Sequence, residues 1–146
     1  MVKHLQKAIL GVTLALVAAL SIGFISAFST INKYQFHSHY AGVGHESFMM
    51  TQIRGRIKMQ YFGYNIDNDI VVSKQFYGLF LRYGAHYFVL AKEQNTADHN
   101  QHLTARSYFI ESNGENAILI SDQRGVFITK SKTPLHLNSV LTGSVV

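Results

Sequence analysis

The chain contains no cysteine, no tryptophan, one proline and few charged residues. Without cysteine it forms no disulfide, uses no thiol nucleophile and offers no thiolate ligand to zinc or an iron–sulfur cluster. Charged residues make up 14% of the 146 residues and apolar residues 47%, whereas ordinary soluble proteins carry roughly 25% charged residues. This composition excludes an intrinsically disordered chain and indicates a membrane segment or a surface poor in charge.

The N-terminal segment has the length and composition of a membrane anchor. Residues 8–28 read AILGVTLALVAALSIGFISAF and contain no charge. A helix of this length spans about 31 Å, close to the thickness of a bilayer core. A cleaved secretory signal peptide is the alternative, but Ile25 stands where a cleavage site prefers a small residue. We therefore predict an uncleaved transmembrane anchor over residues 8–28.

The charges that flank this segment predict its orientation. Lys3 and Lys7 precede the anchor, and Lys33 is the one basic residue that follows it closely. The positive-inside rule then makes residues 1–7 a cytoplasmic tail and residues 33–146 a periplasmic domain of a bacterial inner-membrane protein. The lipid bilayer is one expected partner. Direct binding of nucleic acid is not expected, because so short a tail holds no domain.

Residues 33–146 carry the patterns of one small antiparallel β domain, so the predicted fold class is mainly β with an N-terminal transmembrane helix. Apolar and polar residues alternate over residues 34–40 and 56–61, which is typical of two-faced strands. A return strand is predicted from residue 70. Residues 79–91 are predicted to form one long strand in which Gly84 is a bulge or a bend.

The C-terminal third has the clearest hairpin signal. Asn113-Gly114 lies between two apolar runs and predicts a type I′ turn, in which both central residues have a positive φ. Residues 126–131 are predicted to add a third strand that Pro134 ends, with no pairing signal after it. The polar residues 94–102 are predicted to be a loop, and residues 103–109 fit either a strand or a short helix.

Histidine offers the main candidate chemistry. His37 and His39 share one face of a predicted strand, with Cβ atoms about 7 Å apart, and His45 follows in a glycine-containing loop. Imidazole nitrogens suit zinc or copper, so these three are candidate metal ligands. Two alternatives stay open: a response to mild acidification, because imidazole titrates near pH 6.5, and ordinary exposed histidines.

Other motifs predict binding surfaces and turns, not catalysis. Arg54, Arg56 and Lys58 are placed on one strand face, where they suit an anionic partner, a lipid headgroup or solvent. The run Asp67-Asn68-Asp69 lacks the later ligands of a calcium loop and is predicted to be a turn. No serine-hydrolase elbow, zinc-protease motif or phosphate-binding loop occurs. We therefore predict that the protein is not an enzyme and needs no cofactor.

Four stretches of the outer part resemble the FidL-like family of enterobacterial inner-membrane proteins. They are IRGRIKMQYFG, NDIVVS, LRYGAHYFVLAKE and AILISDQRGVFITKSKTPLHL. This resemblance implies a noncatalytic accessory protein, similar in layout to ToxS, that binds a membrane-bound transcription regulator with a cytoplasmic DNA-binding domain. Strand addition at an exposed β edge is the expected mode of binding. A histidine-based metal or pH-responsive module and an envelope assembly component are the alternative functions.

Overall fold

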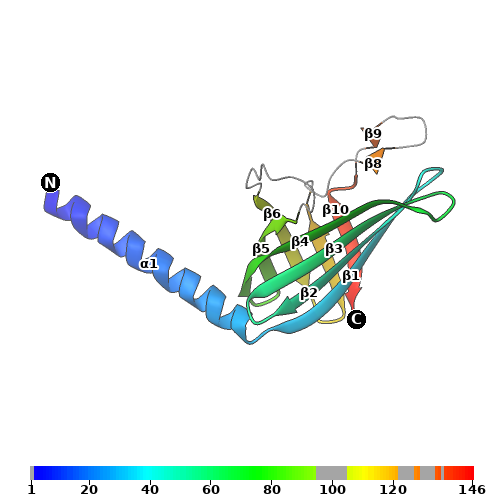
Figure 1. Ribbon diagram of the computed structural model, residues 1–146. Coiled ribbons are helices and arrows are strands. Elements are labelled where there is room, and N and C mark those ends of the chain that lie inside the picture. The colour runs from blue at the N-terminus through cyan, green and yellow to red at the C-terminus, as the bar shows by residue number, and fades with distance from the viewer. Residues whose placement is uncertain (1, 95–104, 122–126, 129–133, 136) are drawn as a thin grey trace.

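A single apolar helix leads into a closed β-barrel (Figure 1). The structure is a computed structural model that describes residues 2–94, 105–121, 127–128, 134–135 and 137–146. The prediction of a mainly β fold with one N-terminal helix and one antiparallel β domain is confirmed.

Helix α1 (Val2–Phe28) is long and apolar enough to cross a membrane. It begins at Val2, so residues 2–7 of the predicted tail, including Lys3 and Lys7, are helical and exposed. The hydroxyls of Thr13 and Ser21 donate to carbonyls one turn earlier in the helix, which satisfies both polar groups without water. Of its residues only Gly23 and Ala27 are buried, and both face the barrel.

Eight strands form the barrel. They are β1 (Ile31–Tyr40), β2 (Gly44–Ile53), β3 (Arg56–Asn65), β4 (Ile70–Tyr83), β5 (His86–Glu93), β6 (Ala105–Ser112), β7 (Asn116–Ile120) and β10 (Val140–Val145). Each pairs with an antiparallel neighbour on both sides, in the order β1-β10-β7-β6-β5-β4-β3-β2. Closure therefore leaves none of these eight strands with an edge that is open along its whole length. Strands β8 (Phe127–Ile128) and β9 (Pro134–Leu135) pair separately.

Aromatic side chains fill the barrel. The alternation predicted for β3 is confirmed, because Ile57, Met59 and Tyr61 point inward and are almost fully buried. At the centre, the ring of Phe48 lies 5.8–6.2 Å from three other buried rings, those of Tyr61, Phe76 and Tyr108. Eight strands enclose a space that side chains of this size can fill, so the barrel has a packed core that needs no disulfide.

Two of the predicted strand boundaries are wrong because the chain reverses within an apolar pattern. The long strand predicted over residues 79–91 is a hairpin: β4 ends at Tyr83, Gly84 turns with a φ of +62°, and β5 begins at His86. The chain also reverses at Arg54-Gly55, where both residues have a positive φ, as a two-residue type I′ hairpin requires. Arg54 therefore lies in a turn and does not share a strand face with Arg56 and Lys58.

The hairpin predicted at Asn113-Gly114 is confirmed, but its predicted turn type is wrong. The connection between β6 and β7 is longer than two residues, and only Gly114 has a positive φ there. The side-chain Oδ1 of Asn113 instead accepts hydrogen bonds from the backbone N–H groups of Glu115 and Asn116. An asparagine that binds its own turn in this way needs no left-handed backbone.

The third strand beside this hairpin is not the predicted one. Strand β10, from the tail for which we predict no pairing, lies between β7 and β1 and closes the barrel. Of the predicted strand 126–131, residues 127–128 form β8 outside the barrel, and the rest lie outside the described residues. Pro134 lies within β9 and ends no barrel strand. Residues 105–109 belong to β6, so the helix alternative is wrong there, and nearly all of the predicted loop 94–102 lies outside the described residues.

Candidate functional site

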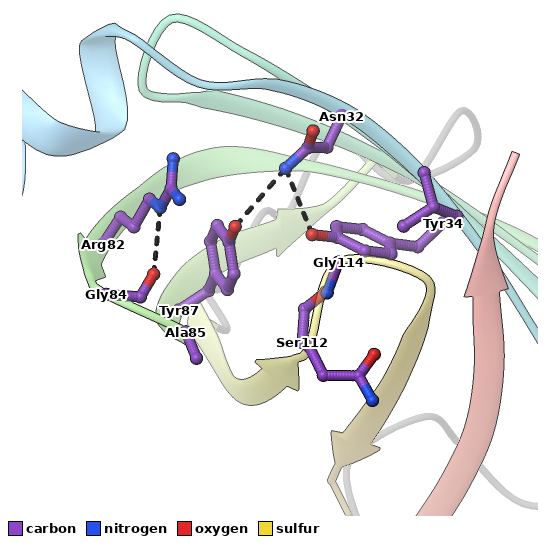
Figure 2. Close-up of a pocket in the computed structure, with 10 residues that line it drawn as sticks. Asn32, Tyr34, Arg82, Gly84, Ala85, Tyr87, Ser112 and Gly114 are labelled. Atoms are coloured by element: carbon purple, nitrogen blue, oxygen red, sulfur yellow. Dashed lines mark hydrogen bonds between the residues drawn. The ribbon is translucent and has the colours of Figure 1, made fainter.

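A polar pocket opens at the end of the barrel nearest α1 (Figure 2). It has a volume of about 480 Å³ and lies among the start of β1, the turn between β4 and β5, and the loop between β6 and β7. Among the residues that line it, Arg82 is the one that carries a charged side chain. A cavity of this volume is within the range of roughly 300–1,000 Å³ that small-molecule sites occupy.

Three inward-facing side chains form the polar floor of the pocket. The amide nitrogen Nδ2 of Asn32 donates to the hydroxyl oxygens of Tyr34 and Tyr87, at 3.1 and 3.3 Å. The two tyrosine rings meet edge to face with centroids 6.2 Å apart, and both are buried. Because inward positions alternate along β1, Asn32 and Tyr34 point into the barrel together, and the pairing of strands fixes both hydroxyls.

The hydroxyl of Tyr87 stays protonated over the physiological pH range. Burial and, second to it, the interaction with Tyr34 raise the pKa of Tyr87 to about 12, a rise that the positive charge of Arg82 partly opposes. A phenol with this pKa is a hydrogen-bond donor and acceptor at neutral pH, not a general base. The floor can therefore bind and orient a ligand but has no group poised for proton transfer.

Arg82 connects the pocket to the end of α1. Its Nε donates to the carbonyl oxygen of Gly84 at 3.0 Å, and its Nη1 donates to Oγ1 of Thr30 at 3.0 Å. Its guanidinium also lies 5.5 Å from the centre of the Tyr87 ring. Thr30 lies two residues after the end of the helix, and its backbone N–H and hydroxyl donate to the carbonyls of Ala27 and Ser26. The pocket and the helix terminus thus share one hydrogen-bonded network.

An apolar row crosses the outer wall of the barrel. The outer apolar row consists of five register partners on β4, β5, β6, β7 and β10: Leu81, Phe88, Phe109, Ile120 and Val140. The exposed fractions of Phe88, Ile120 and Val140 are 50%, 45% and 50%. A depression of about 450 Å³ lies among Phe88, Phe109 and Ile120. Contiguous exposed apolar area of this kind is characteristic of a protein-binding surface.

The outer wall of β1 has the opposite character. Its outward positions are polar or charged from Lys33 to His39, including Gln35 and His37. The alternation within β1 was visible in the sequence, but the in-register alignment of apolar residues from five other strands was not. The barrel therefore has one apolar and one polar outer wall.

A smaller groove lies beside the last turns of α1. It has a volume of about 340 Å³, and its lining includes Phe24, Phe28, Leu79 and the two arginines of the β2–β3 hairpin, Arg54 and Arg56. The hairpin turn, which sequence analysis missed, brings these arginines next to the helix. Lys58 is exposed further along β3, with its Nζ 5.7 Å from the centre of the Tyr77 ring.

The candidate metal ligands do not converge. His37 and His39 are exposed on the outer wall of β1, as predicted. His45 lies in β2 and not in a loop; it is the register partner of His39, and its ring stacks on Tyr64 with centroids 4.5 Å apart. Within the part of the chain that the structure describes, no three histidine, cysteine, aspartate or glutamate side chains are grouped so that they could hold a metal ion.

The acidic run next to β4 forms a turn, as predicted. Oδ1 of Asn65 accepts hydrogen bonds from the backbone N–H groups of Asp67 and Asp69, at 2.9 and 2.8 Å. The amide of Asn65 also bonds the carboxylate of Asp69. These side chains therefore stabilise the β3–β4 connection.

Comparison of the chain with protein-family models, with curated proteins and with solved structures gave no match. The resemblance to the FidL-like family stays a prediction from the sequence patterns. The geometry of the pocket and of the outer apolar row carries the functional proposals.

Proposed function

We propose that this protein is a noncatalytic, single-pass accessory protein of the bacterial inner membrane that binds and modulates a membrane-bound transcription regulator. The observation that carries the proposal is the outer apolar row, which exposes Phe88, Ile120 and Val140 on a barrel whose own core is already complete. Because exposed apolar side chains in register do nothing for the packing of the barrel, their function lies in contact with another molecule.

The anchor supports a partner in the same membrane. Helix α1 crosses the bilayer with Lys3 and Lys7 on the cytoplasmic side and the barrel in the periplasm. Two proteins anchored in one membrane meet at a high effective concentration, so a modest contact area is enough for binding. The row begins at Leu81, two residues before β4 ends beside α1, within reach of the outer domain of such a partner.

Binding occurs through side chains and not by strand addition. Each of the eight barrel strands pairs on both sides, so none of them has an edge that is open along its whole length for strand addition. The depression among Phe88, Phe109 and Ile120 instead accepts an apolar side chain of the partner. Occupancy of this surface shifts the monomer–dimer balance of the regulator or shields it from proteolysis, with a coupling free energy of about 1–3 kcal/mol.

Site-specific photocrosslinking in the native membrane tests this function. A photoreactive amino acid replaces Ile120 on the outer apolar row, or His37 on the polar outer wall of β1 as the matched control. We expect position 120 to capture a membrane protein with a cytoplasmic DNA-binding domain, and position 37 to capture far less of it. Phe109→Ser on the same row should reduce the capture from position 120.

Two outcomes would contradict the proposal. One is capture of the same proteins from positions 37 and 120, because specific docking on the row would then be absent. The other is capture of only the protein itself or of envelope assembly machinery from position 120, which would favour an assembly component instead.

A further inference from the structure

We propose that the polar pocket is a binding site for a small organic carboxylate, with Arg82 as its charged anchor. This inference does not depend on the proposed regulator, because the outer apolar row lies on the outside of the barrel and the pocket opens at its end. The hydrogen-bonding capacity of the pocket, its size and one buried amide beside it all suit such a ligand.

The guanidinium of Arg82 keeps donors for a ligand. Arginine has five N–H donors in a planar fork, and Arg82 uses its Nε toward Gly84 and its Nη1 toward Thr30. These two bonds, together with the ring of Tyr87, hold the guanidinium in a defined plane at the pocket wall. A planar fork of this kind suits the two oxygens of a carboxylate, which can accept parallel hydrogen bonds.

The tyrosine hydroxyls on the floor supply a second donor. The amide of Asn32 donates to both hydroxyl oxygens, so neither phenolic proton is needed for those two bonds. At least one phenolic proton is therefore available to an acceptor in the pocket. Guanidinium and hydroxyl together select an anionic oxygen acceptor.

The size and walls of the pocket select an organic acid. A volume of about 480 Å³ exceeds what a small inorganic anion fills, and the lining includes the rings of Tyr34 and Tyr87 with the aliphatic side chains of Ala85 and Val145. A ligand with a carboxylate at Arg82 and an apolar body against these groups would satisfy both parts of the lining. Pockets with an apolar wall and a few oriented polar groups are the usual form of a small-molecule site.

A buried side-chain amide also lies next to the pocket floor. Gln52 is the register partner of Asn32 on the neighbouring strand, is fully buried, and points into the barrel. Neither its Oε1 nor its Nε2 has a hydrogen-bond partner. An unpaired buried amide destabilises a fold, so its position beside the pocket floor is typical of a site organised for binding.

Fluorine NMR with para-fluorobenzoate as the probe tests the proposal on the full chain in detergent micelles. The probe carries a carboxylate on an apolar ring, and para-fluorobenzamide, of the same shape without the charge, is the control ligand. We expect saturable broadening of the benzoate signal by the protein beyond that caused by empty micelles, and none of this excess for the benzamide. Arg82→Gln should abolish it.

Two further variants keep the test decisive. Tyr87→Phe preserves the ring and should weaken binding of para-fluorobenzoate about tenfold, because a hydrogen bond to a charged acceptor is lost. Arg56→Gln, which removes an exposed arginine outside the pocket, should leave binding unchanged. The proposal is overturned by the absence of saturable binding, by equal binding of the benzamide, or by unchanged binding in Arg82→Gln.

Discussion

The hydroxyl of Tyr83 on β4 donates a 2.8 Å hydrogen bond to the backbone carbonyl of Ala19 in α1. The tyrosine ring crosses the helix at Gly23, where an added Cβ would lie 2.5 Å from the Tyr83 hydroxyl oxygen. Ala27, one turn further along, is fully buried against the barrel. Small residues on one face of α1 therefore allow the barrel to pack directly on the helix.

Substitution Gly23→Leu should separate the helix from the barrel. The new side chain occupies the position of the Tyr83 ring, so the hydrogen bond to Ala19 is lost while the barrel stays folded. Because the chain has no cysteine, spin labels can be placed uniquely at Val12→Cys and Ser73→Cys. Pulsed EPR should then give a broader distance distribution between the labels for Gly23→Leu than for the parent.

Gly11→Leu is the matched control for this experiment. A Cβ at Gly11 meets no atom within 4 Å, so this variant adds the same side chain to the same helix without touching the barrel. Its distance distribution should equal that of the parent. An unchanged distribution in Gly23→Leu as well would show that Tyr83 does not hold the helix.

The raised pKa of Tyr87 predicts a loss of stability at alkaline pH. In the folded chain this pKa is about 12, against 10.0 for an unperturbed tyrosine, so the unfolded chain releases its proton first. The free energy of unfolding should therefore be unaffected by this group below pH 10 and should fall as the pH rises from 10 toward 12. Thermal unfolding followed by tyrosine fluorescence measures this dependence.

Tyr87→Phe should reduce this alkaline loss of stability without removing it. Burial and the bond to Glu46 also raise the pKa of Tyr40, which contributes in the same direction. The control Tyr77→Phe, which removes a tyrosine from an exposed position of β4, should keep the full dependence. If Tyr87→Phe and Tyr77→Phe lose stability equally between pH 10 and 12, the assignment to Tyr87 is wrong.

Tyr40 and Glu46 form a buried hydrogen bond at the far end of the barrel. The hydroxyl of Tyr40 donates to Oε1 of Glu46 at 2.7 Å and accepts from the backbone N–H of Asn138 at 3.0 Å. Tyr40→Phe removes a donor from a fully buried carboxyl group and an acceptor from the segment before β10. We expect a loss of about 1–3 kcal/mol in the free energy of unfolding, measured with urea.

A double-mutant cycle separates this bond from general disturbance of the core. Glu46→Gln and Tyr40→Phe should each destabilise the chain, and the double variant should lose less than the sum of the two losses. Additive losses would mean that the two side chains do not stabilise each other.

Replacement of Gln52 by methionine should stabilise the protein. The unbranched apolar side chain has nearly the same shape, and it removes an amide that is buried without a hydrogen-bond partner. We expect a gain of about 1 kcal/mol in the free energy of unfolding. Gln75→Met, at an exposed position of β4, should change it by less than about 0.5 kcal/mol. A loss of stability in Gln52→Met would show that the amide has a stabilising role.

Strands could be predicted where apolar and polar residues alternate and clear turn residues follow. In β3 the alternation of Ile57, Met59 and Tyr61 with polar residues identified the buried face correctly. The reversals at Gly55 and Gly84 were missed because the residues around them continue an extended, partly apolar pattern. β10 was missed because it contains glycine and serine and is held by pairing on both sides, which no local pattern expresses.

The pocket and the outer apolar row could not be predicted from spacing. Asn32, Arg82 and Tyr87 come from different strands, and each is an unremarkable polar residue in its own segment. A metal site was predicted at His37, His39 and His45 because these residues are close along the chain. In the structure, the ring of His45 stacks on Tyr64 of β3. Proximity along the chain predicts a site poorly when strands pair across many residues.

The sequence by itself determined an apolar N-terminal helix and a mainly β domain, because helix length and strand alternation are local properties of the chain. Only the tertiary structure decided that the sheet closes on itself, that five apolar side chains align on one outer wall, and that Asn32, Arg82 and Tyr87 line one pocket. These relationships depend on strand order and register. Both are set by the combined packing of residues far apart in the chain, and no single segment encodes them.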